Sequence, residues 1–297
     1  MSYHTFMKKI LSEVYGLSVL EVSSLSRKDA ENDNDLYKII TSEGEYFLKE
    51  IPGHSKREDT ESIYTELCKC KLSKSRMVLP LKSHDGKYLV SIIDKDMMLY
   101  RFVEHRVLSE IDIETDRILD VLEDLFNGFS KINIPKHPFK TYNNWFERGV
   151  SQLRKKVPGH NFLDLFEDYT NTRFLELDFK VGNAHFDLNP FNIWVDDNND
   201  ILLSDFDNAQ IAAYAKDIFD ACSRFVKVSN EGVELSESNI EMIFKFSKKY
   251  ISNIEIRDVK YLLTRPKLGN LFDPKSDYSD EELTKKMDDF FEFCSNQ

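Results

Sequence analysis

The fold is decided by residues 185–207, which read His185-Phe186-Asp187-Leu188-Asn189-Pro190-Phe191-Asn192, then Ile193-Trp194-Val195, an acidic turn at 196–200, and Ile201-Leu202-Leu203-Ser204-Asp205-Phe206-Asp207. Two short apolar runs around a turn rich in Asp and Asn predict a β-hairpin. Asn192 enters the first strand and Asp205 leaves the second, so an amide and a carboxylate lie side by side, with Asp187 on the preceding loop. Such hard oxygen ligands suit Mg²⁺, which completes its shell with water and substrate phosphates. The stretch therefore predicts a site for a nucleotide and its metal ion.

At these residues the chain resembles the aminoglycoside phosphotransferase and choline kinase family, which shares its core fold with protein kinases. The resemblance rests on His-x-Asp-x-x-x-x-Asn followed by an Asp-Phe-x triplet, here His185, Asp187, Asn192 and 205–207. It implies that Asp187 is the catalytic base for a substrate hydroxyl, that His185 braces the loop, and that Asn192 and Asp205 bind the metal. The alternative without a catalytic role is a solvated Asp/Asn-rich loop beside an edge hairpin.

Asp207 takes the place of the usual glycine in the triplet, as acidic residues do in choline-kinase-like members. It is a candidate for the metal site, and contact with a cationic acceptor or capping of the following turn are equally open.

The first hundred residues predict a small antiparallel sheet. Strands at 37–40 and 46–51 flank the tight-turn sequence Ser42-Glu43-Gly44-Glu45. By the resemblance, Lys49 in the second of these strands contacts the α- and β-phosphates of the nucleotide. A helix predicted over 57–71 would supply its carboxylate partner, Glu61 or, failing that, Glu58.

The segment between the first two strands contains no glycine, although protein kinases cover the phosphates there with a glycine-rich loop. Ser24 and Ser26 are the candidates to reach the nucleotide in its place. The resemblance puts the hinge near 101–104, where Phe102 and Val103 would bind the purine through backbone groups. The choice between ATP and GTP stays open.

The predicted fold class is α+β, with a bilobal protein-kinase-like architecture. Residues 1–104 form the nucleotide-binding lobe, with further strands at 77–81, 88–93 and 97–103. Residues 105–297 form a helical lobe that carries the catalytic loop and the acceptor site, beginning with an amphipathic helix at 118–129. Asp217 follows Asp205 by twelve positions and is expected to open a helix and steady the catalytic loop. So short a gap leaves no room for the activation segment of a protein kinase, which favours a small-molecule acceptor.

Other parts of the helical lobe carry weaker signals. The aromatic residues Trp145, Phe146, Phe162 and Phe166 are expected to pack between helices rather than stack on a substrate. Capping boxes beginning at Ser238 and Ser279 predict two helix starts.

Composition limits the function classes. The 297 residues are 41% hydrophobic and 31% charged, with a net charge of −12. This excess of carboxylates argues against nucleic acid and anionic membrane surfaces as partners, and it is compatible with a cationic acceptor. The four cysteines show no metal-ligand spacing and imply no disulfide framework. No stretch is long and apolar enough to cross a membrane, so we expect a soluble cytoplasmic protein.

Together these observations predict an enzyme that uses ATP and Mg²⁺ to move the γ-phosphate to a hydroxyl of a small molecule, such as an aminoglycoside, amino alcohol, sugar or hydroxy amino acid. A degenerate kinase fold that serves as a binding module, and a kinase-like enzyme that modifies a protein, are the alternatives. The acceptor cannot be read from the sequence, because the family builds its acceptor site from variable helices.

Overall fold

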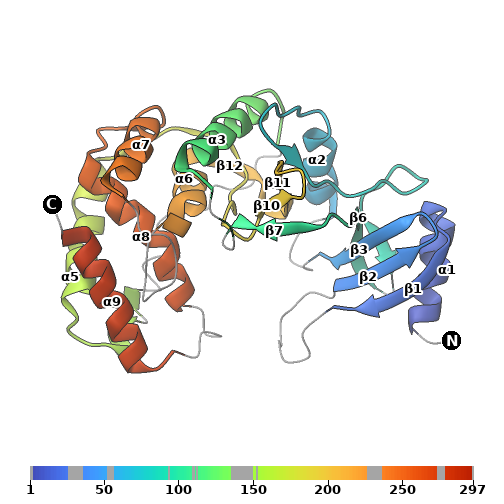
Figure 1. Ribbon diagram of the computed structural model, residues 1–297, viewed down its shortest axis with the longest axis horizontal. Coiled ribbons are helices and arrows are strands. Elements are labelled where there is room, and N and C mark those ends of the chain that lie inside the picture. The colour runs from blue at the N-terminus through green and yellow to red at the C-terminus, as the bar shows by residue number, and fades with distance from the viewer. Residues whose placement is uncertain are drawn as a thin grey trace.

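The computed structural model describes residues 3–25, 36–51, 57–92, 94–108, 111, 113–134, 150–151, 153–225, 236–272 and 278–295. A sheet-containing lobe and a larger helical lobe lie side by side, with a hairpin between them (Figure 1). The predicted α+β fold class, with a small antiparallel sheet in one lobe and mainly helices in the other, is confirmed. No helix among the described residues is both long enough and apolar enough to span a lipid bilayer.

The small lobe is built on a five-stranded antiparallel sheet. Its strands follow the order β1 (Val19–Ser24), β2 (Leu36–Thr41), β3 (Gly44–Glu50), β6 (Lys95–Arg101) and β5 (Val90–Ile92). The turn between β2 and β3 contains Gly44 at φ 135°, a conformation that favours glycine. Both strands that meet there were predicted within about two residues of their observed bounds.

The two faces of this sheet pack against different parts of the protein. Because side chains alternate along a strand, Leu48 and Leu99 point to one face, where they pack on Met7 and Leu11 of α1 (Tyr3–Tyr15). Lys49 occupies the opposite face, which borders α2 (Arg57–Leu67) and the helical lobe. The apolar side of the sheet is thus sealed by a helix, and the side that carries Lys49 is turned toward the second lobe.

A second sheet joins the lobes, in the order β4 (Arg76–Met77), β11 (Ile201–Leu203), β10 (Ile193–Asp196) and β7 (His105–Val107). The predicted hairpin is present, with Ile193 opposite Leu203. The strand predicted at 77–81 is wrong, because β4 ends at Met77 and pairs in parallel with β11 instead of joining the small sheet. Pro80 has no N–H for a ladder, which limits the extension of this strand. β7 pairs with β10 of the hairpin, and the lobe boundary near residue 104 stays a prediction.

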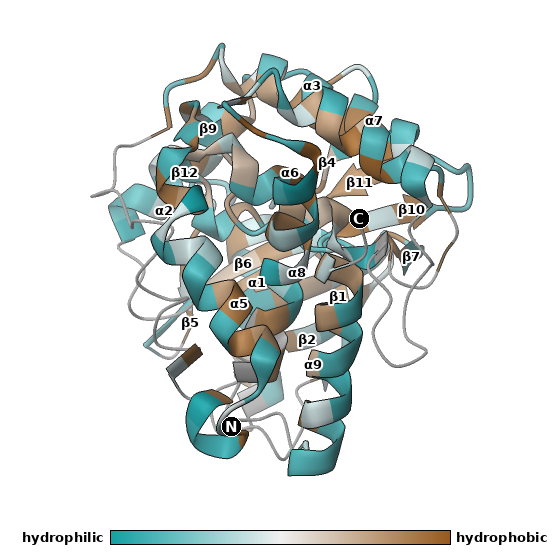
Figure 2. Cartoon of the chain, turned by 90° about the vertical axis from the view of Figure 1, so that its left-hand side faces the viewer, coloured by the Kyte–Doolittle hydropathy of each residue, from teal (hydrophilic) through white to brown (hydrophobic). Residues whose placement is uncertain are grey.

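The rest of the large lobe is helical. It contains α3 (Thr115–Phe129), α5 (Asn161–Asn171), α6 (Tyr214–Cys222), α7 (Glu237–Ser247), α8 (Ile256–Phe272) and α9 (Asp280–Ser295). Two short ribbons complete it, β8 (Asp178–Phe179) with β13 (Ile251–Ser252) and β9 (Val181–Ala184) with β12 (Gln210–Ala213). These helices carry both hydrophobic and hydrophilic residues along their length, as expected when one face of each helix is buried (Figure 2).

Most local predictions in this lobe are confirmed. Phe162 and Phe166 are buried, and the Phe162 ring lies against Phe290 of α9, so these aromatics pack between helices. Trp145 and Phe146 lie outside the described residues. The capping box at Ser279 is present, since Ser279 N–H donates to Glu282 and Glu282 N–H to the Ser279 hydroxyl. The predicted cap at Ser238 is wrong, because the side chain of Ser236 caps α7.

Gly182 on β9 generates a prediction about packing between β9 and α6. A Cβ atom at this position would lie 2.0 Å from the hydroxyl and 2.4 Å from Cζ of Tyr214, a buried ring at the start of α6. We expect Gly182→Ala to lower the free energy of unfolding by about 1–3 kcal/mol, the usual cost of overpacking. Urea unfolding measures it, and Tyr214→Leu should remove most of the effect in the double variant. An additive double variant would contradict the proposed clash.

Candidate active site

One buried carboxylate fixes the backbone of the loop 185–192. Asp217 lies in the first turn of α6 and is fully buried; its Oδ2 accepts the N–H of His185 at 2.7 Å and its Oδ1 that of Phe186 at 2.8 Å. Phe186 has φ 69°, a left-handed conformation that is costly for a bulky residue and is maintained by these contacts. Burial raises the pKa of Asp217 from 3.8 to about 7. The contact expected of Asp217 is therefore present.

His185 connects the loop to the neighbouring strand. Its side chain is fully buried, and burial lowers its pKa to about 4, so the imidazole is neutral at physiological pH. The backbone N–H of Asp187 lies 3.3 Å from Nδ1, and Nε2 lies 2.8 Å from the carbonyl oxygen of Ser204. These two contacts fit a single neutral tautomer, in which Nδ1 accepts and Nε2–H donates. His185 thereby ties the loop to the residue that precedes Asp205.

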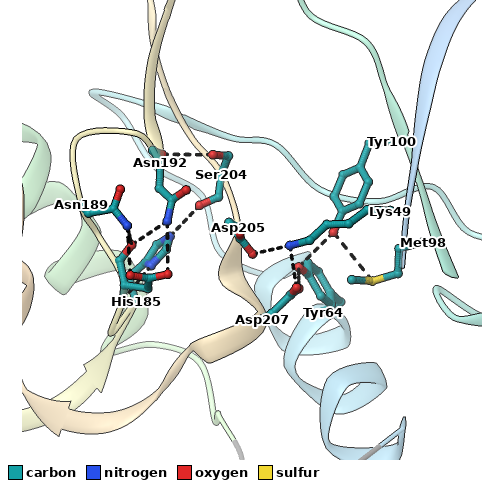
Figure 3. Close-up of polar contacts among 11 residues, drawn as sticks. Lys49, Tyr64, Met98, Tyr100, His185, Asn189, Asn192, Ser204, Asp205 and Asp207 are labelled. Carbon is teal, nitrogen blue, oxygen red and sulfur yellow. Dashed lines mark hydrogen bonds and ion pairs between the residues drawn. The ribbon is translucent and has the colours of Figure 1, made fainter. Parts of the chain in front are cut away.

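The amides of Asn189 and Asn192 orient the loop around Asp187. Asn189 Nδ2 donates to the Asp187 carboxylate at 3.0 Å, and Asn192 Nδ2 donates to the Asp187 carbonyl at 2.8 Å. Because the nitrogen of Asn192 faces the loop, its amide oxygen is directed toward the side on which Asp205 lies (Figure 3). Burial raises the pKa of Asp187, even though the Lys216 ammonium opposes the shift.

Asp205 lies two residues after the end of β11, beyond Ser204, and has φ 61°. Burial favours the neutral acid, but the Lys49 ammonium at 2.7 Å from Oδ1 outweighs it, so the pKa of Asp205 falls below its usual range. Its ionised carboxylate and the amide oxygen of Asn192 form a donor set that fits Mg²⁺, which accepts few protein ligands. Among the described residues no group of three or more His, Cys, Asp or Glu side chains is arranged to hold a metal ion. A metal at this site would therefore depend on the amide and on substrate oxygens.

Lys49 crosses from the small lobe to two carboxylates of the large lobe. Its ammonium is 2.7 Å from Asp205 Oδ1 and 2.8 Å from Asp207 Oδ2 (Figure 3). The other oxygen of Asp207 accepts the hydroxyl of Tyr64, on α2, at 2.6 Å. The hydroxyls of Tyr64 and Tyr100 are 3.1 Å apart, which extends the network to β6. Each oxygen of Asp207 thus has its own donor, the Lys49 ammonium for Oδ2 and the Tyr64 hydroxyl for Oδ1. Binding of a metal by Asn192, Asp205 or Asp207 stays a prediction.

The expected pairing of Lys49 with a carboxylate of α2 is wrong in this structure. Glu61 accepts the backbone N–H groups of Tyr88 and Leu89 at 3.0 and 2.7 Å, and Glu58 is exposed. Glu61 therefore secures the chain next to β5. The residue of α2 that reaches the site is Tyr64, three positions further along the same helix. Asp207 in place of glycine was the available signal, because it supplies the counter-charge that Glu61 was expected to provide.

The structure describes three of the four remaining residues that were predicted to bind the nucleotide. Ser24 is exposed at the end of β1, and Ser26 lies outside the described residues. In the hinge, Phe102 N–H donates to the Glu45 carbonyl at 2.9 Å. Val103 O is 2.6 Å from Nδ1 of His105, so that nitrogen carries a proton. Binding of a nucleotide by Ser24, Phe102 and Val103 stays a prediction.

His105 also links the predicted hinge to the β10–β11 hairpin. Its ring stacks on Trp194 of β10 with centroids 3.8 Å apart, and Trp194 Nε1–H donates to the carbonyl of Phe191 in the loop 185–192 at 2.8 Å. Sequence reasoning did not find this connection, because nothing in the spacing of these residues predicts that β7 and β10 pair.

Comparison with known proteins gives the family. A model of the phosphotransferase enzyme family (APH) matches residues 25–236, more than half of the chain, and the chain belongs to this family. A search of curated proteins found no relative of significant similarity.

Solved structures share the fold across nearly the whole chain. A spectinomycin phosphotransferase in complex with ADP and spectinomycin is 13% identical, with a TM-score of 0.66, and the match covers 98% of this chain and 97% of that one. Amicoumacin kinase in complex with AMP-PNP and Ca²⁺ is 15% identical, with a TM-score of 0.64 and coverages of 98% and 92%. A choline kinase from Streptococcus pneumoniae is 15% identical, with a TM-score of 0.55 and coverages of 98% and 99%.

The partner of Lys49 can be tested by double-mutant cycles. We expect Lys49→Met and Asp207→Asn to show a coupling energy of about 1–3 kcal/mol in urea unfolding, as contacting residues in one network do. The matched cycle of Lys49→Met with Glu61→Gln should give a coupling near zero. A larger coupling to Glu61 than to Asp207 would show that the helix carboxylate is the partner after all.

The buried Asp217 predicts a particular pH dependence. Because its pKa is raised from 3.8 to about 7, the folded protein keeps a proton that the unfolded chain releases, and this carboxyl contributes less stability as pH rises from about 4 to about 7. We expect the unfolding free energy of the wild type, minus that of Asp217→Asn, to fall between pH 4.5 and pH 7.5. Urea titrations at a series of pH values measure the difference, and a difference that grows with pH would contradict the raised pKa.

Proposed function

We propose that this protein is an ATP-dependent phosphotransferase that moves the γ-phosphate to a hydroxyl group of a small molecule. The observation that carries the proposal is the contact of Lys49, from the small lobe, with Asp205, which follows the catalytic hairpin. It brings a cation suited to phosphates next to the proposed metal ligands. Asp187 lies on the loop that Asn192 holds in place. The spectinomycin, amicoumacin and choline enzymes of the same fold support a small acceptor.

In the proposed reaction the site residues act mainly by positioning charged groups around the phosphates, and less by forming bonds themselves. Mg²⁺ bound by Asn192 and Asp205 would neutralise charge on the phosphate oxygens. Lys49 would bind the α- and β-phosphates, and its ammonium remains charged because the carboxylates of Asp207 and Asp205 outweigh the effect of burial and raise its pKa. Fixed charges of this kind stabilise the transition state without reorganising.

Asp187 is proposed to orient the acceptor hydroxyl and to accept its proton. Burial raises the pKa of this carboxyl, which makes the carboxylate a better proton acceptor than an exposed one. His185 does not compete for that proton, since its pKa is about 4 and both ring nitrogens are already hydrogen-bonded. Its proposed role is to keep the backbone of Asp187 in place.

The acceptor side favours a small molecule over a protein. Residues 206–216 run directly from the short helix Phe206–Asn208 through β12 into α6. The chain between the metal-site carboxylate Asp205 and Asp217 therefore forms a tight connection that offers no extended platform for a peptide. Reaction with ATP rather than GTP, dependence on Mg²⁺ and a location in the cytoplasm are parts of the same proposal.

We expect Asp187→Ala to reduce phosphate transfer by at least about a hundredfold, as loss of a preorganised catalytic group does. The assay is ATP consumption against a panel of amino alcohols, aminoglycosides, sugars and hydroxy amino acids. ATP binding, followed by calorimetry with Mg²⁺, should change little, because Asp187 is not among the proposed nucleotide ligands. Transfer at the wild-type rate by folded Asp187→Ala would refute the assignment of the base.

A further inference from the structure

A cation that the proposed mechanism does not use lies next to the catalytic loop. Lys216 is in the first turn of α6, one residue before the carboxylate that clamps the loop. Its ammonium lies 4.9 Å from the centroid of the Phe186 ring, over the face of the residue that precedes Asp187. It also forms an ion pair with Asp220, one turn further along the helix.

This ion pair is withdrawn from solvent. The side chains of Lys216 and Asp220 are only 23% and 11% exposed. Burial disfavours the charged lysine, but the carboxylates of Asp220, Asp217 and Asp187 outweigh it and raise its pKa. The catalytic carboxyl is affected in return, since Lys216 opposes the rise in its pKa that burial causes. A permanent positive charge is thus built in beside the proposed base.

The surroundings of this charge have the chemistry of an ammonium-binding site. An aromatic face attracts a cation through its quadrupole, and a partly buried carboxylate provides a strong charge-assisted hydrogen bond. A free amino alcohol would need the same two elements close to the base that handles its hydroxyl. In this chain both are already occupied by the ammonium of Lys216.

We propose that the ammonium of Lys216 occupies a subsite beside Asp187 that would otherwise bind an ammonium group of the acceptor. The acceptor therefore presents a neutral hydroxylated region there, as a sugar or polyol does, and not an ammonium group. Lys216 is in this view a specificity-determining residue. An ammonium group of the acceptor would meet a like charge and find the carboxylate taken, and such repulsion discriminates against one ligand class. The inference rests on the proposed function and names the acceptor class at the same site.

Chemical rescue tests the subsite without knowledge of the acceptor. Lys216→Ala removes the ammonium but keeps Phe186 and Asp220, so ethylammonium chloride should restore thermal stability with a saturable dose dependence. Sodium chloride at equal ionic strength and neutral 1-propanol should not. The wild type should show no specific stabilisation by ethylammonium or ethanolamine, whereas Lys216→Ala should be stabilised by both and not by ethylene glycol.

Two control variants make the result specific. Lys216→Ala combined with Asp220→Asn removes the ammonium together with the carboxylate that it pairs with, so this variant is a control for the loss of Lys216 alone, and it should not respond to ethylammonium. Lys245 also pairs with a carboxylate four residues away, Glu241, at 2.8 Å, but both side chains are exposed. Lys245→Ala should therefore show no rescue.

The proposal is overturned if ethylammonium stabilises Lys216→Ala no more than the double variant, or if ethanolamine stabilises the wild type as strongly as it stabilises Lys216→Ala. Neither measurement requires turnover. Specific rescue in a protein that neither binds ATP with Mg²⁺ nor transfers phosphate would refute the proposed function and retain the ammonium subsite. Transfer to small hydroxylated molecules without rescue would retain the function and refute the subsite.

Discussion

The contact of the Lys49 ammonium with Asp205 and Asp207 is the interaction on which the site depends, because it joins the two lobes at the point where the chemistry is proposed to occur. Lys49 extends from the central part of the small sheet, whose other face is covered by α1. Burial makes an unpaired lysine expensive, so the ammonium needs the two carboxylates as much as they need it. Tyr64 completes the arrangement by donating to the remaining oxygen of Asp207.

The catalytic loop shows how a short irregular segment is kept in one conformation. Its backbone N–H groups are not part of a sheet or helix, and a buried carboxylate on α6 accepts two of them. A neutral histidine accepts a third and donates to the strand that leads to Asp205. Strained backbone at Phe186 and Asp205 is maintained by these contacts. The large lobe thus supplies a rigid support, on which Asp187 and Asp205 are presented toward the small lobe.

Much of this could be predicted from residues close together in the sequence. The β10–β11 hairpin, α3 and the capping box at Ser279 depend on apolar periodicity and local hydrogen bonds, which the chain encodes over a few positions. The strand at 77–81 failed, since parallel pairing of β4 with β11 joins segments more than a hundred residues apart. The cap of α7 failed by two residues, because Ser236 and Ser238 are both good caps and the sequence alone does not choose between them.

By itself the sequence determined which chemical groups are present and in what order: a base, an amide and a carboxylate at fixed spacing, a lysine in an early strand, and the resemblance to a family that transfers phosphate. Only the tertiary structure decided which groups meet. It paired Lys49 with Asp207 and not with Glu61, it brought Tyr64 to the site, and it placed the ammonium of Lys216 over Phe186. The physical reason is that spacing along the chain fixes local conformation, whereas the direction of a long side chain and its partner depend on how separate elements pack.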